Sequence, residues 1–204
     1  AARREERLRE LAEDYPDSAR AVPTDITKPP EVRSLVKETL DAFGCVDILI
    51  NNAGVGHYAP MDEARLDHWN NMMDVNVKGI LNTLHASLPC LKETKGHIVN
   101  ISSVAAHNVY PGSVVYRASK HAVQALMKGF RKEMRDEVRI TNIAPGAVDT
   151  EFPEHTDHPE YVEHFKEYFR EPLIHPEDIA DSVVHILTLP EHLVVNDYVI
   201  RPNR

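Results

Sequence analysis

The apolar positions of the chain recur with two different periods, and these periods alternate along it. Spacings of three and four predict helices, whereas short runs that are apolar throughout predict buried strands. The predicted helices cover residues 3–13, the stretch from Thr27 to Phe43, 62–92, 113–136 and 177–189. The predicted strands are residues 20–24, 46–50, 97–101, 138–143 and 194–200. Residues 151–175 lack clear periodicity and are predicted as a loop with a helix near 159–169.

Strands that alternate with helices indicate a parallel sheet whose two faces are both covered. The predicted fold class is therefore α/β, a doubly wound parallel sheet in a three-layer α/β/α arrangement. No internal repeat or low-complexity linker interrupts the 204 residues, and this length is enough for a substantial core. We therefore expect residues 1–204 to form a single domain.

The charge balance narrows the range of partners. Lys and Arg number 23 against 32 Asp and Glu, and no basic block occurs, which argues against nucleic acid and anionic membranes as partners. The apolar runs are too short to cross a bilayer, and the charged first residues are unlike a secretory signal. The two cysteines lie in no metal or redox spacing, which favours a reducing compartment. We expect a cytoplasmic protein.

Two apparent binding motifs lack the context that they need. Residues 54–59 match G-x-G-x-x-A, but Pro60 follows, and the dinucleotide fingerprint must open a helix directly. The twelve histidines include no H-E-x-x-H and no cluster with metal-like spacing. We expect these histidines to lie on the surface and to hold no metal.

Small and polar residues follow several predicted strands. In such sheets ligands bind beyond the carboxyl ends of the strands. The segments at these ends are Asp25-Ile26, Asn51-Asn52-Ala53-Gly54, Ser102-Ser103 and Pro145 through Thr150. Any one of them could be an ordinary turn, but their recurrence favours a polar ligand at this edge.

The most chemically informative segment combines Ser103 with Tyr116 and Lys120. Residues i and i+4 of a helix share a face, so Tyr116 and Lys120 point the same way. A nearby ammonium lowers the pKa of a phenol, which makes the pair suitable for proton transfer. A serine hydroxyl at the preceding strand end could hydrogen-bond a substrate oxygen. Alone, however, such a pair also arises by chance on solvated helices.

Six segments give this pair a context: Asp25-Ile26-Thr27, Asn51-Asn52-Ala53-Gly54, Asn76 in VNVKG, Ser103 in NISS, Tyr116-x-x-x-Lys120 and Pro145-Gly146-x-Val148-x-Thr150. In order and spacing, the set resembles the short-chain dehydrogenase/reductase family over essentially the whole chain. The resemblance implies a Rossmann-type fold and a general acid/base at Tyr116, whose pKa Lys120 lowers. It also implies that Ser103 polarises the substrate carbonyl and that Asn76 holds a proton-relaying water. The alternative for Asn76 is a solvent-facing helix residue.

The resemblance also implies a nicotinamide cofactor. Its expected contacts are Arg3, Asp25, Ile26, Asn52, Ala53, Gly54, Tyr116, Lys120, Pro145, Gly146, Val148 and Thr150. Enzymes that use NAD place an acid after the second strand, whereas those that use NADP accept the 2′-phosphate with arginine. By similarity Ala2 takes the place of the acid and Arg3 follows it, so NADP(H) is expected in preference to NAD(H). Alternatively, Arg3 and Arg4 belong to an ordinary charged helix.

By the same resemblance, residue 1 begins at the helix after the second strand of the family. We therefore expect an N-terminal glycine-rich strand–helix–strand unit to be absent from the given sequence. The leading hypothesis is an NADP(H)-dependent oxidoreductase that interconverts a carbonyl and a secondary alcohol on a small-molecule substrate, as a homodimer or homotetramer. The alternatives are a catalytically silent nucleotide-binding or scaffold protein, and a lyase or epimerase that retains NAD.

Overall fold

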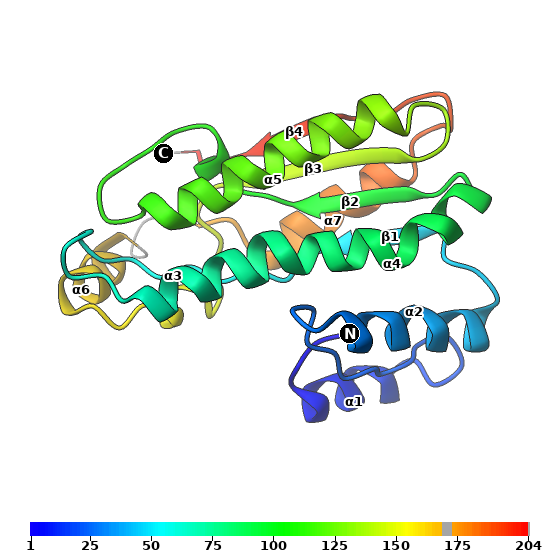
Figure 1. Ribbon diagram of the computed structural model, residues 1–204, viewed down its shortest axis with the longest axis horizontal. Helices are drawn as coiled ribbons and strands as arrows, with labels where there is room; N and C mark the ends of the chain where they lie inside the picture. Colours follow the sequence, from blue (N-terminus) through cyan, green and yellow to red (C-terminus); the bar gives the residue numbers. More distant parts are fainter. Residues whose placement is uncertain (169–172, 204) are drawn as a thin grey trace.

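The computed structural model of the protein describes residues 1–168 and 173–203. One parallel sheet carries the described strands in chain order: β1 (Ile48–Asn51), β2 (His97–Ile101), β3 (Arg139–Pro145) and β4 (Asp197–Ile200). The helices are α1 (Glu5–Glu13), α2 (Pro29–Phe43), α3 (Leu66–Met73), α4 (Ile80–Glu93), α5 (Val114–Glu133), α6 (Pro159–Tyr168) and α7 (Pro176–Leu187). Shorter helical segments are η1 (Asp74–Gly79), η2 (Val104–Ala106) and η3 (Phe152–His155). Figure 1 shows their arrangement.

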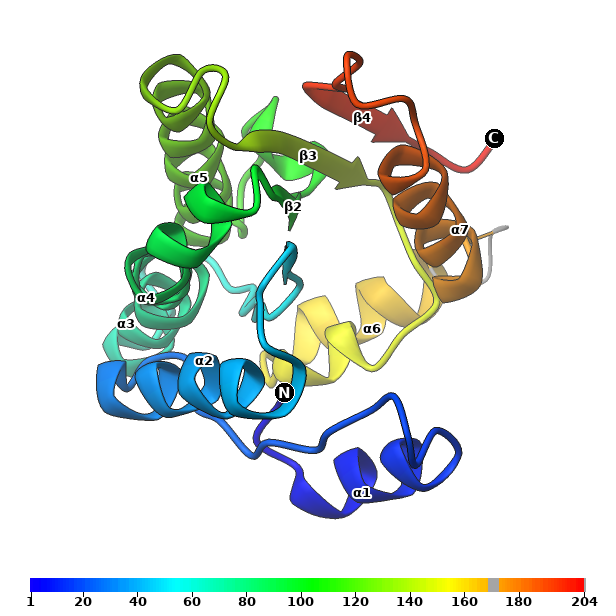
Figure 2. The ribbon, with the colours of Figure 1, turned by 90° about the vertical axis from the view of Figure 1, so that its right-hand side faces the viewer.

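Helices cover the sheet on two faces, as Figure 2 shows. On one face Leu84 and Leu91 of α4 and Met127 of α5 pack against the strand residues Ile98 and Ile140. The opposite face receives α7, whose inward side chains pack against β2 and β3: Ile179, Val183 and Ile186. The structure therefore confirms the α/β fold with a parallel sheet flanked by helices.

The connection through α7 differs in hand from those through α4 and α5. The strand order continues in one direction from β1 to β4, while α7 crosses on the face opposite to α4 and α5. Crossovers that advance in the same direction over opposite faces have opposite hands. Since parallel crossovers are almost always right-handed, one of the two kinds here is a rare exception.

Strand β1 differs from its sequence-based prediction. A run that is apolar throughout predicts burial on both faces, yet Ile48 and Ile50 are each 47% exposed. Leu49 and Asn51 face α4, but on the other side α7 packs against β2 and β3 instead of β1. The strand is therefore covered on one face only.

The N-terminal quarter departs further from the predicted elements. The predicted strand over residues 20–24 is reduced to a single bridge between Pro23 and Ala2, because this segment lies outside the main sheet. Thr27 does not cap α2; its hydroxyl donates to Asp25 instead, and Lys28 takes the cap position. Within α2 only Val32 is fully buried.

A row of polar side chains crosses the sheet beneath α4 and α5. Asn51, Asn100, Asn142 and Asp197 are register partners on the four strands. The Asn142 side chain accepts a hydrogen bond from Asn100 and donates to Asp197 at 3.2 Å. Gln124 of α5 accepts from Asn142 and donates to Asp197. We call these four strand residues the amide row, because three of them are asparagines.

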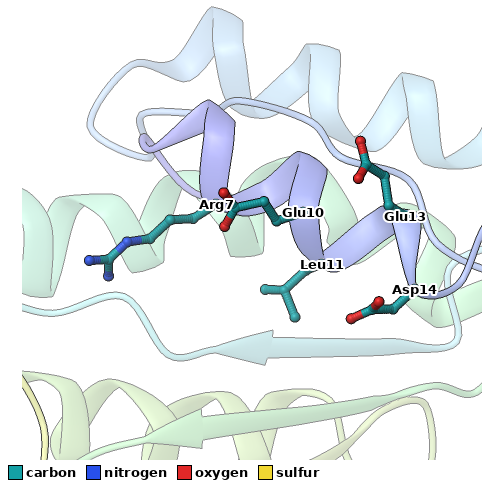
Figure 3. A pocket seen from close by; sticks show the side chains of 5 residues that line it. All are labelled: Arg7, Glu10, Leu11, Glu13 and Asp14. Carbon is teal, nitrogen blue, oxygen red and sulfur yellow. The ribbon is translucent and has the colours of Figure 1, made fainter.

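A surface hollow lies on α1, and Figure 3 shows the side chains that line it. They are Arg7, Glu10, Leu11, Glu13 and Asp14. None of the residues predicted to carry chemistry lines this hollow, so it is not a candidate for the reaction site. Within the two described ranges, no helix combines the length and apolar character needed to cross a membrane.

Candidate active site

Tyr116 and Lys120 lie on the inward face of α5, one turn apart near its start. Each side chain is 6% exposed. The Lys120 Nζ donates a hydrogen bond to the carbonyl of Ile101 at 3.3 Å and lies 5.9 Å from the centre of the Tyr116 ring. The helical spacing thus places both groups beneath the end of β2, as the sequence pattern predicts.

Ser103 stands where the chain leaves β2. Its backbone is extended, and its hydroxyl accepts a hydrogen bond from the amide of Ala105 at 3.0 Å, which opens η2. The Ser103 side chain also lies close enough to Tyr116 to lower the pKa of that phenol. The neighbouring Ser102 hydroxyl is buried and has no partner among the described residues. The structure therefore brings Ser103, and not Ser102, to the phenol.

Burial controls the protonation of the pair. It raises the pKa of the Tyr116 phenol, against the opposing effects of the Ser103 side chain and the Arg117 charge. The lowering by Lys120 that the resemblance implies is not among these effects, because burial dominates at this position. Burial also lowers the pKa of the Lys120 ammonium to about 8, since a low-dielectric surrounding disfavours a charge. At neutral pH this arrangement holds a proton on both groups.

Asn76 lies in η1, a six-residue π-helical segment between α3 and α4. Its side chain is 1% exposed, so the alternative of a solvent-facing residue is wrong. The Asn76 Oδ1 accepts from the Val55 amide and its Nδ2 donates to the Val55 carbonyl, both at 2.8 Å. Nδ2 also donates to Ser119 of α5 at 3.0 Å. Asn76 therefore joins the loop after β1 to the helix that carries Tyr116.

Gly54 lies against this group. A Cβ added at Gly54 would stand 3.5 Å from Asn76 Oδ1 and 3.6 Å from Lys120 Nζ. The preceding Asn52 and Ala53 are exposed at the same loop. The predicted cofactor contacts at residues 52–54 therefore lie beside the predicted catalytic lysine.

Most of the other residues predicted to contact the cofactor are exposed or half-buried, whereas Pro145 is buried. Arg3 is close enough to Asp25 for its charge to help hold the pKa of that carboxyl below its usual value. The Ile26 carbonyl accepts from Asn82 of α4. Pro145 ends β3, the Gly146 amide donates to Ile200, and Thr150 is exposed.

The backbone N–H and C=O groups of Val148 point away from its bridge partner, Ile174. The Asp149 amide donates to the Ile174 carbonyl, and the Ile174 amide donates to the Ala147 carbonyl. In such a parallel bridge the central residue, here Val148, directs its own N–H and C=O to the opposite side. A polar group such as a carboxamide could bind there.

Sequence reasoning missed an aromatic neighbour of Tyr116. The rings of Tyr58 and Tyr116 lie 5.6 Å apart, and those of Tyr116 and Phe152 lie 5.5 Å apart. Phe152 lies two residues after Thr150, the last residue of the predicted segment that follows the strand now seen as β3. Tyr58 belongs to residues 54–59, the segment that matches G-x-G-x-x-A without opening a helix. The one sequence feature that could have placed Tyr58 near the site is the position of this loop directly after a predicted strand.

Comparison with known proteins identifies the family. The family model for short chain dehydrogenases matches residues 1–160. The chain therefore belongs to the short-chain dehydrogenase/reductase family, which confirms the resemblance.

Individual relatives agree with this assignment. An uncharacterized oxidoreductase of Staphylococcus saprophyticus is 39% identical over 207 residues, covering 99% of this chain and 84% of that protein. The closed form of serine dehydrogenase complexed with NADP⁺ matches with a TM-score of 0.91 at 32% identity, covering 98% and 82% of the two chains. An alcohol dehydrogenase from the archaeon Thermococcus sibiricus, complexed with 5-hydroxy-NADP, has a TM-score of 0.85 at 28% identity, covering 98% and 83%.

Proposed function

We propose that the protein is an NADP(H)-dependent oxidoreductase that interconverts a carbonyl compound and a secondary alcohol. One observation carries this proposal: a buried tyrosine, Tyr116, lies close enough to Ser103 for that side chain to lower its pKa, and it lies beside the buried Lys120. A binding module has no need of a desolvated phenol paired with a hydroxyl at a strand end. Proton transfer to a substrate oxygen does need them.

Each residue of the candidate site has a separate role in the proposed reaction. Ser103 donates a hydrogen bond that orients the substrate oxygen, and Tyr116 delivers the proton to that oxygen during reduction. Lys120 stabilises the phenolate that remains, and Asn76 fixes the loop and helix around it while holding the proton-relaying water. When bound, the nicotinamide cofactor supplies or accepts the hydride.

The residues present fit a dinucleotide. The outward backbone of Val148 suits the carboxamide, and the loop of Gly54 beside Lys120 suits a ribose. Arg3, exposed next to Asp25, suits a 2′-phosphate, which favours NADP(H). The cofactors named for the serine dehydrogenase and alcohol dehydrogenase structures agree with this preference.

The test is NADPH absorbance across a panel of ketones, with Tyr116→Phe as the variant and NADH as the alternative cofactor. We expect turnover by the wild type, with at least a hundredfold loss in Tyr116→Phe because the proton donor is gone. Undiminished turnover in the variant would refute the role of the phenol. Tight NADPH binding without any turnover would favour the silent nucleotide-binding protein, and tighter binding of NADH would contradict the assignment of Arg3.

A further inference from the structure

Aromatic side chains from separate segments form a cluster that reaches Tyr116 through Tyr58 and Phe152. Tyr58 follows β1, Phe152 opens η3, and Tyr161 and Phe165 lie on α6. The Tyr58 ring lies 4.8 Å from Phe165 and 6.4 Å from Tyr161, in addition to its contact with Tyr116. We call these four residues, excluding Tyr116, the aromatic cap. All four are half-buried.

Two glycines leave the space that the aromatic cap occupies. A Cβ added at Gly56 would stand 2.5 Å from the Phe152 ring, and one at Gly112 would overlap the Tyr161 hydroxyl. The Gly112 backbone is also in the left-handed region, at φ +72°, where side chains are rarely tolerated. The backbone around the candidate site thus lies directly against flat apolar rings.

The neighbouring cation Arg117 is engaged elsewhere. Its guanidinium lies 4.3 Å from the centre of the Tyr110 ring, and its donors bond to Ser113 Oγ at 2.7 Å and to the Asn108 carbonyl at 3.1 Å. On the other side, His155 meets the aromatic cap with its ring 5.6 Å from that of Phe152, and its Nδ1 pairs with the Phe152 carbonyl. The site therefore combines polar groups at Tyr116 and Ser103 with an apolar wall.

We propose that the substrate is a neutral ketone, or the corresponding secondary alcohol, with an aromatic or similarly flat apolar substituent. This inference rests on the proposed function and names its substrate class. Tyr58 and Phe152 of the aromatic cap pack against Tyr116, so a substrate that reaches Tyr116 must replace contacts between rings. A flat apolar group replaces them with similar contacts, whereas a carboxylate would lose its hydration against the rings.

The first experiment compares three probes in the NADPH absorbance assay: 4-phenyl-2-butanone, 2-butanone and acetoacetate. They share a methyl ketone and differ in carrying a phenyl group, a plain alkyl group or a carboxylate. We expect kcat/KM to be at least tenfold higher for the phenyl ketone than for acetoacetate, with 2-butanone between them. Equal or faster turnover of acetoacetate would overturn the proposed substrate class.

The second experiment removes one ring. We expect Phe152→Leu to raise KM for 4-phenyl-2-butanone about two- to tenfold, the range typical of an aromatic pair, while KM for 2-butanone changes less than twofold. Phe43→Leu is the matched control, because Phe43 is exposed at the end of α2. An equal change for both ketones in Phe152→Leu would contradict a stacking role.

A binding measurement separates this inference from the proposed function. Saturation-transfer NMR with NADP⁺ present detects contact between the protein and the phenyl protons of 4-phenyl-2-butanone. If the signal is present in the wild type and weaker in Phe152→Leu, the preference of the site for a flat apolar ketone stands, and an absence of turnover then counts against the proposed function alone. If no signal is seen at millimolar ketone, the substrate class fails.

Discussion

At the scale of single residues, the charge of the Lys120 ammonium can be tested by varying the pH. Burial lowers the pKa of its ammonium to about 8, so the free enzyme loses this charge within an accessible pH range. Above that pH a neutral lysine no longer stabilises the phenolate that Tyr116 forms during reduction. We therefore expect kcat/KM for the ketone, which includes the proton-transfer step, to fall above about pH 8.

The matching variant is Lys120→Arg. A guanidinium stays charged throughout this pH range, so the variant should lose the inflection near pH 8, whatever its absolute rate. A pH profile of kcat/KM from pH 6 to 10 measures both proteins. The same inflection in the variant would show that another group titrates there.

Sequence reasoning and structure agree on some residues of the site for a physical reason. Tyr116 and Lys120 are one helical turn apart, and this relation is visible in the sequence because it is local. The contact of Tyr58 with Tyr116 and Phe165 joins segments far apart in the chain, so it depends on packing. No local pattern specifies such a contact.

At the scale of elements, the helical stretch from α3 to α4 departs most informatively from prediction. The periodicity predicts one helix over residues 62–92, but the helix begins at Leu66 and contains the π-helical η1. Six residues of altered winding are too few to change an apolar periodicity. The functional consequence is large, because η1 is the segment that carries Asn76.

Gly79 ends η1 in close contact with the segment before α2. A Cβ added there would stand 2.5 Å from the Ile26 Cδ1. We expect Gly79→Ala to destabilise the fold by about 1–3 kcal/mol, as overpacking does, and Ile26→Val to restore part of the loss in the double variant. Urea unfolding measures the change.

Gly129 of α5 provides the matched control. A Cβ there would meet nothing within 4 Å, so Gly129→Ala should stabilise the protein by up to about 1 kcal/mol through helix propensity alone. If both substitutions change stability alike, close packing at Gly79 is not the cause of its effect.

At the scale of the whole molecule, the buried His97 makes the stability of the fold depend on pH. The side chain is 2% exposed at the start of β2 and lies 2.8 Å from the Thr141 hydroxyl. Burial, aided by the charge of Arg139, lowers the pKa of His97 to about 4. An unfolded histidine titrates near pH 6.5, so below that pH the unfolded chain binds the proton first and the folded state loses stability.

Integrated over this interval, His97 should remove about 2 kcal/mol of unfolding free energy between pH 7 and pH 5. His97→Gln keeps a donor for Thr141 and cannot take up the proton, so its pH dependence should be shallower by that amount. Urea unfolding of both proteins at the two pH values tests this. Parallel pH dependences would exclude His97 as the source.

The amide row favours one register of pairing between neighbouring strands. In a sheet that is apolar on both faces the register of strand pairing is weakly specified. A shift of the register by one residue then only replaces one apolar face with another. Here such a slip would set Asn100 or Asn142 against an aliphatic side chain and would break the hydrogen bond from Asn100 Nδ2 to Asn142 Oδ1, at a cost of about 1–3 kcal/mol. Misaligned pairings are thereby disfavoured just before the chain leaves the sheet at Asn52, Ser103 and Gly146, so the same residues that reject wrong registers also set the level at which these loops begin.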